Sequence, residues 1–571
     1  MLDRAAEDQG NNRGWRRFIP GPTHRVVILV SAVLAFFVVY PLVTLVLRSF
    51  QVETVPRHYD FTLGNYSSAF ATHNTYESLV NSLIFALGSA TLALIIGGSL
   101  AWLSQRSNMP FAKVVLPVAI IPLVFPKVLE AVAWVFLLND RIGLLRFLPL
   151  DIYSLPGMIW VQGIGDSSLA FLMMAAAFRL MDPALEESAH MSGASGPQVV
   201  RWVTLPLLRP AAFSAFLLMF VRSLEAFAVP AVIGIPGRIY VYTTEIWFAF
   251  NQVPVQPGVG AALAIGLLII SVVGVGMYIR ATRLSERFAT VGGKAFRPRR
   301  VDLGRVRWPA FGVTLFVVLI IVGAPLFIVL WTSFLRFYQV PSIEALGSLS
   351  FDNFRYLFNF DAFWPAVRNS FLVSASAATL VMFLTSIVSW LRYKSRLKGM
   401  TLLEYGAMTP IAVPGLVLGT ALIVLYVANP IPIYGTLWIV LIAYATKYLP
   451  YGMRFASSSM IQIGGELEEA ARVSGASWFQ GFRRVTLPLL RPGFVAGWIY
   501  ILIVGVKEFS TSVLLVNQKT IVLSVLVYQI NERGRATAVS ALGVMMVLAL
   551  IVVVVVFQRV TGRIGIQEQV E

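Results

Sequence analysis

Residues 185–210 read LEESAHMSGASGPQVVRWVTLPLLRP, and residues 467–492 read LEEAARVSGASWFQGFRRVTLPLLRP. The two segments align without a gap at a constant spacing of 282 residues, and a match of this length indicates duplication rather than chance. Further pairs lie 288 residues apart: Asn81-Ser82 with Asn369-Ser370, Trp102-Leu103 with Trp390-Leu391, and Pro122 and Pro126 with Pro410 and Pro414. The chain therefore consists of two related halves.

The composition is that of a membrane protein. Of the 571 residues, 57% are hydrophobic and 13% are charged, whereas about 25% of residues are charged in an ordinary soluble domain. The formal net charge is +17, and the basic residues flank long apolar runs, a distribution that orients membrane proteins. The chain has no cysteine, which excludes a disulfide scaffold, thiolate metal sites and a cysteine nucleophile.

Twelve apolar stretches are long enough for membrane-spanning helices, each of which needs about 20 residues. They cover residues 26–47, 78–103, 114–138, 155–178, 208–233, 259–279, 309–335, 367–391, 401–428, 434–453, 493–516 and 536–558. Six stretches fall in each half, and an even number of spans per half makes the two repeats parallel. We therefore predict an all-α polytopic membrane protein with twelve transmembrane helices in two tandem six-helix repeats.

Lysine and arginine in the connections predict the domain boundaries and the orientation. The N-terminal segment 1–25 and the linker 282–308 are rich in arginine, so we place both in the cytoplasm, together with the tail 559–571. The first half then covers residues 26–281 and the second half covers residues 309–558. The connections 49–77 and 234–258 contain one arginine each and face outward. This predicts a multi-pass protein of a bacterial-type inner membrane with both termini in the cytoplasm.

The basic linker 282–308 allows two interpretations. No aromatic interleaving and no nucleic-acid-binding motif accompanies its positive charges. We therefore expect the linker to lie near the anionic lipids of the bilayer, and we expect no binding of nucleic acid.

The duplicated segment is predicted to form a helix–turn–helix between the fourth and fifth spans of each half. In the first copy, Asp182 suits the N-cap, Pro183 suits the first helical position, and Gly193 suits the left-handed residue that ends a helix. Ser195, or Ser477 in the second copy, can then cap a second short helix. We expect Pro206 and Pro488 to close that second helix before the next span.

These loops resemble the signature of permease subunits of binding-protein-dependent ABC importers. In that signature, Glu-Ala-Ala is followed after three residues by Gly, and nine residues later by a branched apolar residue, one further residue and Leu-Pro. The second copy matches in full, with Glu469, Ala470, Ala471, Gly475, Val485, Leu487 and Pro488. The first copy matches at Glu187, Ala189, Gly193, Val203, Leu205 and Pro206 and departs at Ser188.

Within that superfamily, the fused double-length form is similar to the ferric-iron permeases. The segment VPAVIGIPGRIYVYTTEIW at 229–247 resembles their first half. Related permeases serve thiamine, phosphonate and polyamines, so these solutes stay open beside ferric iron.

The resemblance implies a type I importer permease and a division of labour among subunits. The two loops would seat in clefts of two ATP-binding-cassette ATPase subunits, and an extracytoplasmic solute-binding protein would deliver the solute for alternating access. ATP and Mg would bind the partner ATPases. In agreement, the chain has no G-x-x-x-x-G-K-[ST] loop, and no two of its four histidines have ligand spacing on a helix. We expect a permease subunit without catalytic residues and without a cofactor of its own.

Charged residues inside the predicted spans are candidates for the solute pathway. Lys127 and Glu130, and likewise Arg222 and Glu225, are three residues apart, so each pair can form a bridge on one helix face. Glu508 has no such neighbour, and its partner must come from another helix, water or the solute. We therefore name Glu130, Glu225 and Glu508 as pathway candidates. Whether the pathway holds a metal stays open.

An ion-gradient-driven secondary carrier is the alternative from another class. It would share the helix count and the parallel repeat, but it would not need twin cytoplasmic loops with fixed glycine and proline spacing. A membrane enzyme is disfavoured because the sequence offers no catalytic constellation.

Overall fold

The computed structural model describes residues 22–55, 58–288, 301–395, 397–428, 431–463, 470, 473–475 and 478–562. These residues are mainly helical. Two short strands, β1 (Gln51–Val55) and β2 (His58–Phe61), form an antiparallel hairpin in which Gln51 lies opposite Phe61. The hairpin was not predicted, and it lies in the connection after the first span.

The helices of the first half are, in chain order, α2 (Pro22–Leu34), α3 (Tyr40–Ser49), α4 (Gly64–Phe70), α5 (His73–Arg106), α6 (Ala112–Val124), α7 (Lys127–Leu138), α8 (Leu155–Leu180), α9 (Pro183–Met191), α10 (Gly196–Val199), α11 (Leu205–Leu224), α12 (Tyr242–Asn251) and α13 (Pro257–Phe288). Those of the second half are α14 (Arg307–Val318), α15 (Ala324–Ser333), α16 (Ile343–Leu346), α17 (Asp352–Phe358), α18 (Phe363–Tyr393), α19 (Thr401–Met408), α20 (Gly415–Ala428), α21 (Leu437–Gln462), α23 (Trp478–Gly481), α24 (Leu487–Val506), α25 (Leu523–Glu532) and α26 (Ala536–Gly562).

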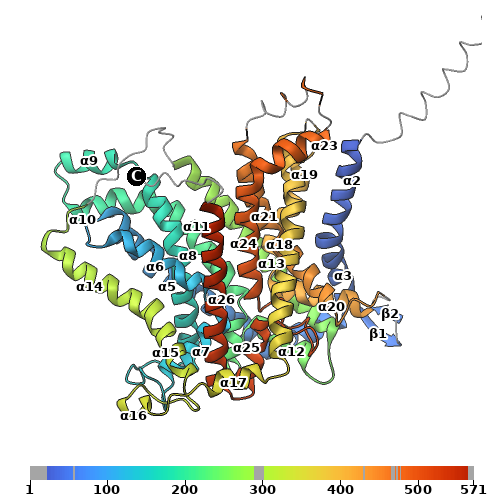
Figure 1. Ribbon diagram of the computed structural model, residues 1–571, viewed down its shortest axis with the longest axis horizontal. Helices are drawn as coiled ribbons and strands as arrows, with labels where there is room; N and C mark the ends of the chain where they lie inside the picture. Colours follow the sequence, from blue (N-terminus) through green and yellow to red (C-terminus); the bar gives the residue numbers. More distant parts are fainter. Residues whose placement is uncertain are drawn as a thin grey trace, which may run out of the picture.

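The membrane-spanning segments confirm the all-helical membrane fold and are compatible with the predicted count of twelve. Nine helices of the described chain are long and apolar enough to cross a membrane, and two helix pairs meet the same criterion as bent spans. The twelfth predicted segment is α21, which has the same length as its counterpart α8 but is less apolar. Figure 1 shows the long helices running between two ends of the molecule; α9, α10 and α23 lie at one, here called the loop end, and α16 and α17 lie at the other.

Two predicted stretches, 114–138 and 401–428, are broken helices. The pair α6 and α7 is bent by 102°, and α19 with its extension Thr409–Ala412 is bent by 103° relative to α20. The breaks fall before Pro126 and Pro414, which the repeat aligns. Proline disfavours a helical conformation in the preceding residue, and Phe125 and Val413 are indeed extended.

Two other stretches, 208–233 and 493–516, are helical only in part, because α11 ends at Leu224 and α24 ends at Val506. Glu225 and Glu508 therefore follow helix ends instead of lying within helices. At Glu508 the physical reason is visible. Its side chain accepts a hydrogen bond from the backbone N–H of Thr511, which offers the chain an alternative to the helical pattern.

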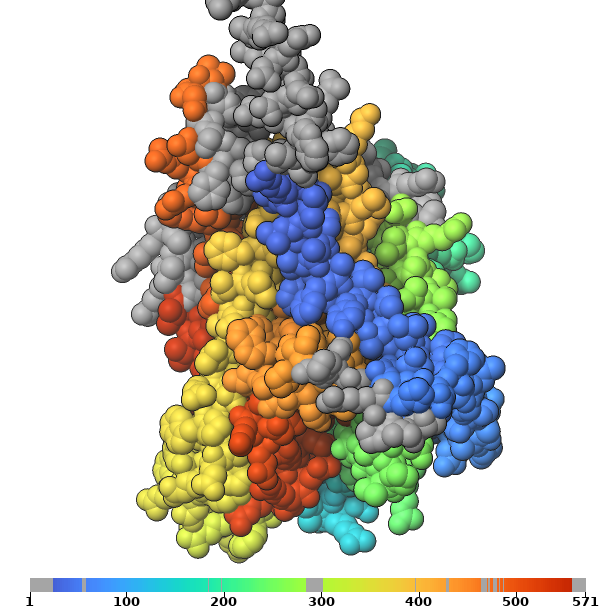
Figure 2. Space-filling view, turned by 90° about the vertical axis from the view of Figure 1, so that its right-hand side faces the viewer, coloured from blue at the N-terminus to red at the C-terminus, as the bar shows by residue number. Residues whose placement is uncertain are grey.

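The first span of each half packs on helices of both halves, since α3 also contacts α13 and α15 also contacts α26. The helices α2 and α3 contact α19 and α20, and α15 contacts α7; Figure 2 shows the N-terminal helices lying across the second half. Individual hydrogen bonds confirm the exchange: the Thr446 hydroxyl donates to the carbonyl of Phe37 at 3.1 Å, and the Tyr338 hydroxyl donates to the carbonyl of Phe136 at 2.7 Å. Buried side chains of both halves form one continuous core.

The repeated Asn-Ser pair fixes an equivalent short helix in each half. The Ser82 hydroxyl accepts a hydrogen bond from the N–H of Tyr242, the first residue of α12. The Ser370 hydroxyl accepts one from the N–H of Leu523, the first residue of α25. Since the first N–H groups of a helix have no partner within it, these serines position α12 and α25 against the second span of each half.

The end of the linker docks on the turn between α5 and α6. The N–H of Val301 donates to the carbonyl of Arg106 at 2.7 Å, and the N–H of Asn108 donates to the carbonyl of Val301 at 3.1 Å. Hydrogen bonds from the Gly304 N–H and the Asn108 side chain lower the pKa of Asp302. The linker is therefore attached to the first half at the loop end.

Candidate functional site

The first duplicated loop folds largely as its sequence predicts. The Asp182 carboxylate caps α9 by accepting a hydrogen bond from the N–H of Ala184 at 2.9 Å. Gly193 has a φ of +87°, which confirms the predicted left-handed residue. Ser195 occupies the next N-cap position, where its N–H donates to the Gln198 side chain at 2.8 Å. Gly193 is exposed at the corner.

The prediction that Pro206 and Pro488 close the second short helix of each loop is wrong. Instead, α10 continues through a π turn at Val200–Thr204 into α11, and α23 continues through a π turn at Phe482–Thr486 into α24. A π turn is a common way to accommodate an irregularity inside a helix. Each loop is therefore rigidly continuous with the following span.

The second loop is described only in part. Gly475 has a φ of +82° and is exposed, in agreement with its counterpart. Ala470 is also exposed, and Pro488 lies at the start of α24. Glu469 and Ala471 lie outside the described residues.

Glu186, which sequence reasoning passed over in favour of its neighbour Glu187, connects the first loop to the body of the protein. Its carboxylate pairs with the guanidinium of Arg106, which is 1% exposed, and accepts a hydrogen bond from Thr204 at 2.6 Å. Glu187 and Ala189 are half-buried. Through Arg106, Glu186 connects α9 to α5, and through Thr204 it connects α9 to the π turn before α11. The carbonyl of Arg106 also accepts the hydrogen bond from Val301 that holds the linker.

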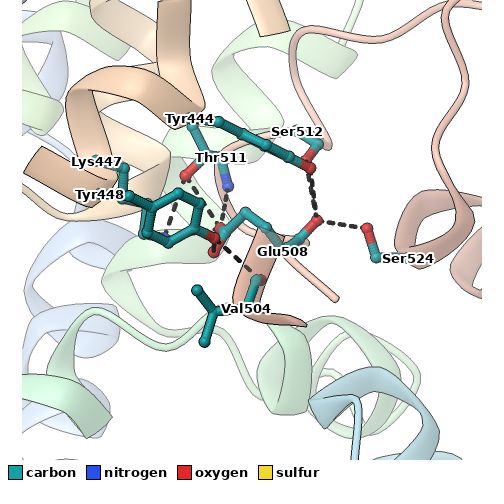
Figure 3. Close-up of polar contacts among 8 residues, drawn as sticks. All are labelled: Tyr444, Lys447, Tyr448, Val504, Glu508, Thr511, Ser512 and Ser524. Carbon is teal, nitrogen blue, oxygen red and sulfur yellow. Dashed lines mark hydrogen bonds and ion pairs between the residues drawn. The ribbon is translucent and has the colours of Figure 1, made fainter. Parts of the chain in front are cut away.

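Figure 3 shows the polar network around Glu508 at the end of α24. Its carboxylate accepts hydrogen bonds from Lys447 at 2.7 Å, from Tyr448 at 3.0 Å and from both the N–H and the hydroxyl of Thr511 at 3.0 Å. The partner of Glu508 thus comes from another helix, α21, one of the three predicted possibilities. With 12% of its side chain exposed, this carboxylate has little remaining capacity to accept further hydrogen bonds.

The first half contains a different charge network. Lys127 Nζ lies 3.1 Å from Glu130 Oε2, which confirms that predicted pair, and 3.5 Å from Asp166 Oδ1 on α8. The predicted pair of Arg222 with Glu225 is wrong. Arg222 instead pairs with Asp166 on the neighbouring helix α8, with 3.8 Å between Nη2 and Oδ1.

Glu225 faces the interface between the halves. By the repeat offset of 282, Glu225 aligns with Lys507, and Glu508 aligns with Ala226, so the two carboxylates stand one position apart in the repeat. Among the described residues, Glu508 bonds to Lys447 and Glu225 does not.

The lysines of the two networks come from opposite helices. Lys127 begins α7, and the equivalent residue of α20, 288 positions later, is Gly415; Lys447 lies in α21, and the equivalent residue of α8, 282 positions earlier, is Gly165. A Cβ on Gly415 would lie 2.6 Å from Lys447 Nζ, and a Cβ on Gly165 would overlap Lys127 Nζ. Each half therefore places an ammonium between these two helices. Both repeat offsets were available from the sequence, but the pairing of the helices was not.

Four aromatic rings form a column across the interface. Trp247 on α12, Phe227, Phe509 and Tyr528 on α25 follow one another with ring centroids 6.2, 5.7 and 5.3 Å apart. Phe227 and Phe509 are buried and stacked with an interplanar angle of 9°. Both flanking helices lie toward the end opposite the loops (Figure 1).

The described residues contain no group of three or more His, Asp or Glu side chains arranged to hold a metal ion. The charge cluster at the interface consists instead of alternating acids and bases.

Comparison with known proteins identifies the family. The family model of the binding-protein-dependent transport system inner membrane component matches residues 91–289 and 382–564. The chain belongs to this family. One match falls in each half, so this permease is a multi-pass inner-membrane subunit of an ABC importer that contains the family domain twice.

Relatives of the permease are described as transporting two kinds of solute. The putative ferric transport system permease protein FbpB 1 of Haemophilus influenzae is 25% identical over 519 residues, which cover 86% of this chain and 78% of that protein. The ferric transport system permease protein FbpB of Actinobacillus pleuropneumoniae is 24% identical over 570 residues, covering 96% and 79%. The putative 2-aminoethylphosphonate transport system permease protein PhnV of Salmonella paratyphi A is 27% identical over 207 residues, covering 36% and 77%.

Among solved structures, a bacterial ABC transporter involved in the import of the acidic polysaccharide alginate is similar with a TM-score of 0.37 and 18% identity, covering 45% of this chain and 96% of that chain.

Proposed function

We propose that this permease imports ferric iron, delivered by an extracytoplasmic binding protein, and that two ATPase subunits drive the cycle. The observation that carries the proposal is the pair of equivalent corners, each with an exposed left-handed glycine, at Gly193 and Gly475. A protein that binds one corner can bind the other in the same way. The names of the relatives that match most of the chain support ferric iron as the solute.

The coupling contacts would be made by the residues of the repeated signature. These are Glu187, Ala189, Gly193 and Pro206 in the first loop, and Glu469, Ala470, Ala471, Gly475 and Pro488 in the second. Since α10 and α23 continue into α11 and α24, a displacement of the loops by the ATPases would move these spans, which end at Glu225 and Glu508.

The solute pathway would follow the interface of the halves, past Glu130, Glu225 and Glu508. In the described conformation, the aromatic column closes this interface between α12 and α25. We place the loop end in the cytoplasm, following the charges of the connections, so the column would be the outward gate of an alternating-access cycle.

The test is solute-stimulated ATP hydrolysis by the purified complex of permease, ATPases and binding protein in lipid nanodiscs. We expect ferric iron presented by the binding protein to stimulate hydrolysis and to be accumulated in proteoliposomes only with ATP on the loop side. Accumulation driven by a proton or sodium gradient without ATPases would instead support the secondary-carrier alternative.

A second candidate solute is 2-aminoethylphosphonate. A relative described as a permease for this compound matches 36% of the chain, and the interface offers bases as well as acids. The same assay with 2-aminoethylphosphonate, thiamine and a polyamine in place of iron distinguishes these candidates by which solute stimulates hydrolysis.

A further inference from the structure

Two groups at the interface of the halves have hydrogen-bonding capacity that nothing around them uses. Within the part of the chain that the structure describes, no hydrogen bond and no ion pair reaches the Glu225 carboxylate, although its side chain is not fully exposed. Among the described residues, the Arg222 guanidinium pairs only with Asp166, at 3.8 Å, and its buried Nε has no hydrogen-bond partner there. Unpaired charges at membrane depth are costly and are typical of solute pathways.

The surrounding charges do not supply the missing partners. Glu508 is engaged by Lys447 at 2.7 Å, and Glu130 forms an ion pair with Lys127 at 3.1 Å, although Lys127 Nζ and Glu130 Oε2 are, like Arg222 Nε, buried without a hydrogen-bond partner. The fourth base, Lys507, crosses the interface to the carbonyl of Leu123 at the end of α6. Among the described residues, Glu225 is thus the acid without an ion pair, and Arg222 is the base whose single ion pair is as long as 3.8 Å.

The cluster as a whole is balanced in charge. Lys127, Arg222, Lys447 and Lys507 face Glu130, Asp166, Glu225 and Glu508. A solute with a single net charge would disturb this balance. A solute that carries a positive and a negative group would preserve it, because each group could meet the opposite charge.

We propose that Glu225 and Arg222 form the solute-binding pair of the pathway, in which Glu225 receives the cationic part of the solute and Arg222 receives its anionic part. The proposal rests on the proposed import function and specifies its solute class. Two sources have this chemistry: a zwitterion such as 2-aminoethylphosphonate, or a metal cation that carries an anionic chelator. Glu508, in contrast, acts through its bond to Lys447 and does not contact the solute.

Direct binding to the purified permease in nanodiscs tests the pair without ATPases. The probes are 2-aminoethylphosphonate, followed by phosphorus NMR line broadening, and ferric nitrilotriacetate, followed by equilibrium dialysis. Ethylphosphonate and ethylamine carry one charge each and serve as competitors. We expect at least one two-charge probe to bind, and each single-charge competitor to bind at least about 10-fold more weakly, because each lacks one charge-assisted contact.

The variants Glu225→Gln and Arg222→Gln should each weaken binding of that probe about 10-fold or more, and Glu225→Asp should weaken it less. The matched control is the Arg392 and Glu404 pair, which lies outside the cluster with 3.2 Å between Nε and Oε2; Arg392→Gln and Glu404→Gln should bind like wild type. Thermal unfolding of each variant within a few degrees of wild type separates lost binding from lost folding.

Two results would overturn the inference. One is equal binding of the single-charge and two-charge compounds, and the other is wild-type affinity in both interface variants. If neither probe binds while ATP-driven uptake of another solute persists, the pair is not the binding site although the import function stands. Loss of uptake with every solute would instead count against the import function itself.

Discussion

At the residue scale, one half has Lys127 where the other has Gly415, and Gly165 where the other has Lys447. This exchange leads to a prediction about stability. Lys447→Gly leaves Glu508, with 12% of its side chain exposed, without its cation, and breaking a buried pair in this way costs about 3–5 kcal/mol. Adding Gly415→Lys should return an ammonium from α20, since a Cβ at Gly415 would lie 2.6 Å from the position of Lys447 Nζ; it would also lie 2.6 Å from Thr511 Oγ1, which must shift in both Gly415 variants. We expect the double variant to recover more than half of the lost thermal stability, measured by the unfolding midpoint in detergent.

The control for this experiment is Lys447→Gly combined with Gly415→Ala, which restores volume without charge and should recover nothing. A double variant with Gly415→Lys that unfolds as early as Lys447→Gly alone would show that the position of the ammonium is not interchangeable.

The glycine at the corner of each loop makes a second residue-scale prediction. A Cβ on Gly193 would meet no atom within 4 Å, and its φ of +87° costs an L-residue about 1 kcal/mol. Gly193→Trp should therefore fold, but it should reduce the amount of ATPase that copurifies and abolish transport, because the indole occupies the corner. Gly475→Trp should act similarly.

Gly399 provides the comparison, since it has a φ of +85°, has equally open surroundings and lies outside both loops. Gly399→Trp should retain the ATPase. Full transport by Gly193→Trp would refute the coupling role of the corner.

At the element scale, the sequence predicted the helices well where periodicity and caps decide them, as in α9. It did not predict the breaks at Pro126 and Pro414, although both prolines were visible. A proline in an apolar run is compatible with a kink or with a complete break, and the choice is made by the neighbouring helices that receive the freed ends. For the same reason, the early ends of α11 and α24 depend on side-chain bonds such as that of Glu508 with Thr511.

Weakening the aromatic column should open the interface between the halves to a measurable extent. Stacking of Phe227 on Phe509 contributes about 0.5–1.5 kcal/mol beyond burial, so Phe509→Leu should shift the interface toward opening by roughly 2- to 10-fold. In this cysteine-free chain, a cysteine at the buried Ala228 reports the opening by its rate of thiol labelling, which should rise by that factor.

Phe360, the second residue after α17, stacks on Tyr356 of α17 with 5.5 Å between the ring centroids. Phe360→Leu removes a comparable ring, and it should leave the labelling of Ala228→Cys unchanged. An unchanged rate in Phe509→Leu would show that the column does not hold the interface closed.

At the scale of the whole molecule, the repeat and the apolar stretches were sufficient to predict two tandem six-helix halves. They could not predict that α2 and α3 pack on the second half or that α15 packs on the first. The apolar pattern shows that a helix face is buried but not which helix covers it, so it does not distinguish the two arrangements. The candidate site was predictable only in part. Lys447 pairs with Glu508 and Asp166 pairs with Lys127 across different helices, and the sequence does not show which helices lie side by side.

The orientation makes a prediction for the entire chain. Ser67 on α4 and Ser192 at the end of α9 are both exposed, and we place them on opposite sides of the membrane. Ser67→Cys should be labelled by an impermeant thiol reagent added to intact spheroplasts, whereas Ser192→Cys should be labelled only after the membrane is permeabilised. Labelling of both before permeabilisation would refute the proposed topology.

The covalent joining of the halves has a consequence for how this protein can change over generations. In a permease assembled from two copies of one chain, a mutation appears twice, so a lysine lost from one helix is lost on both sides of the axis at once. Here Lys127 with Gly165, and Gly415 with Lys447, are encoded separately. One half can therefore move its ammonium to the facing helix while the other keeps the original arrangement, and Glu225 can be released from its counter-ion while Glu508 retains one. Duplication followed by fusion allows an asymmetric binding site to arise within a pseudo-symmetric frame.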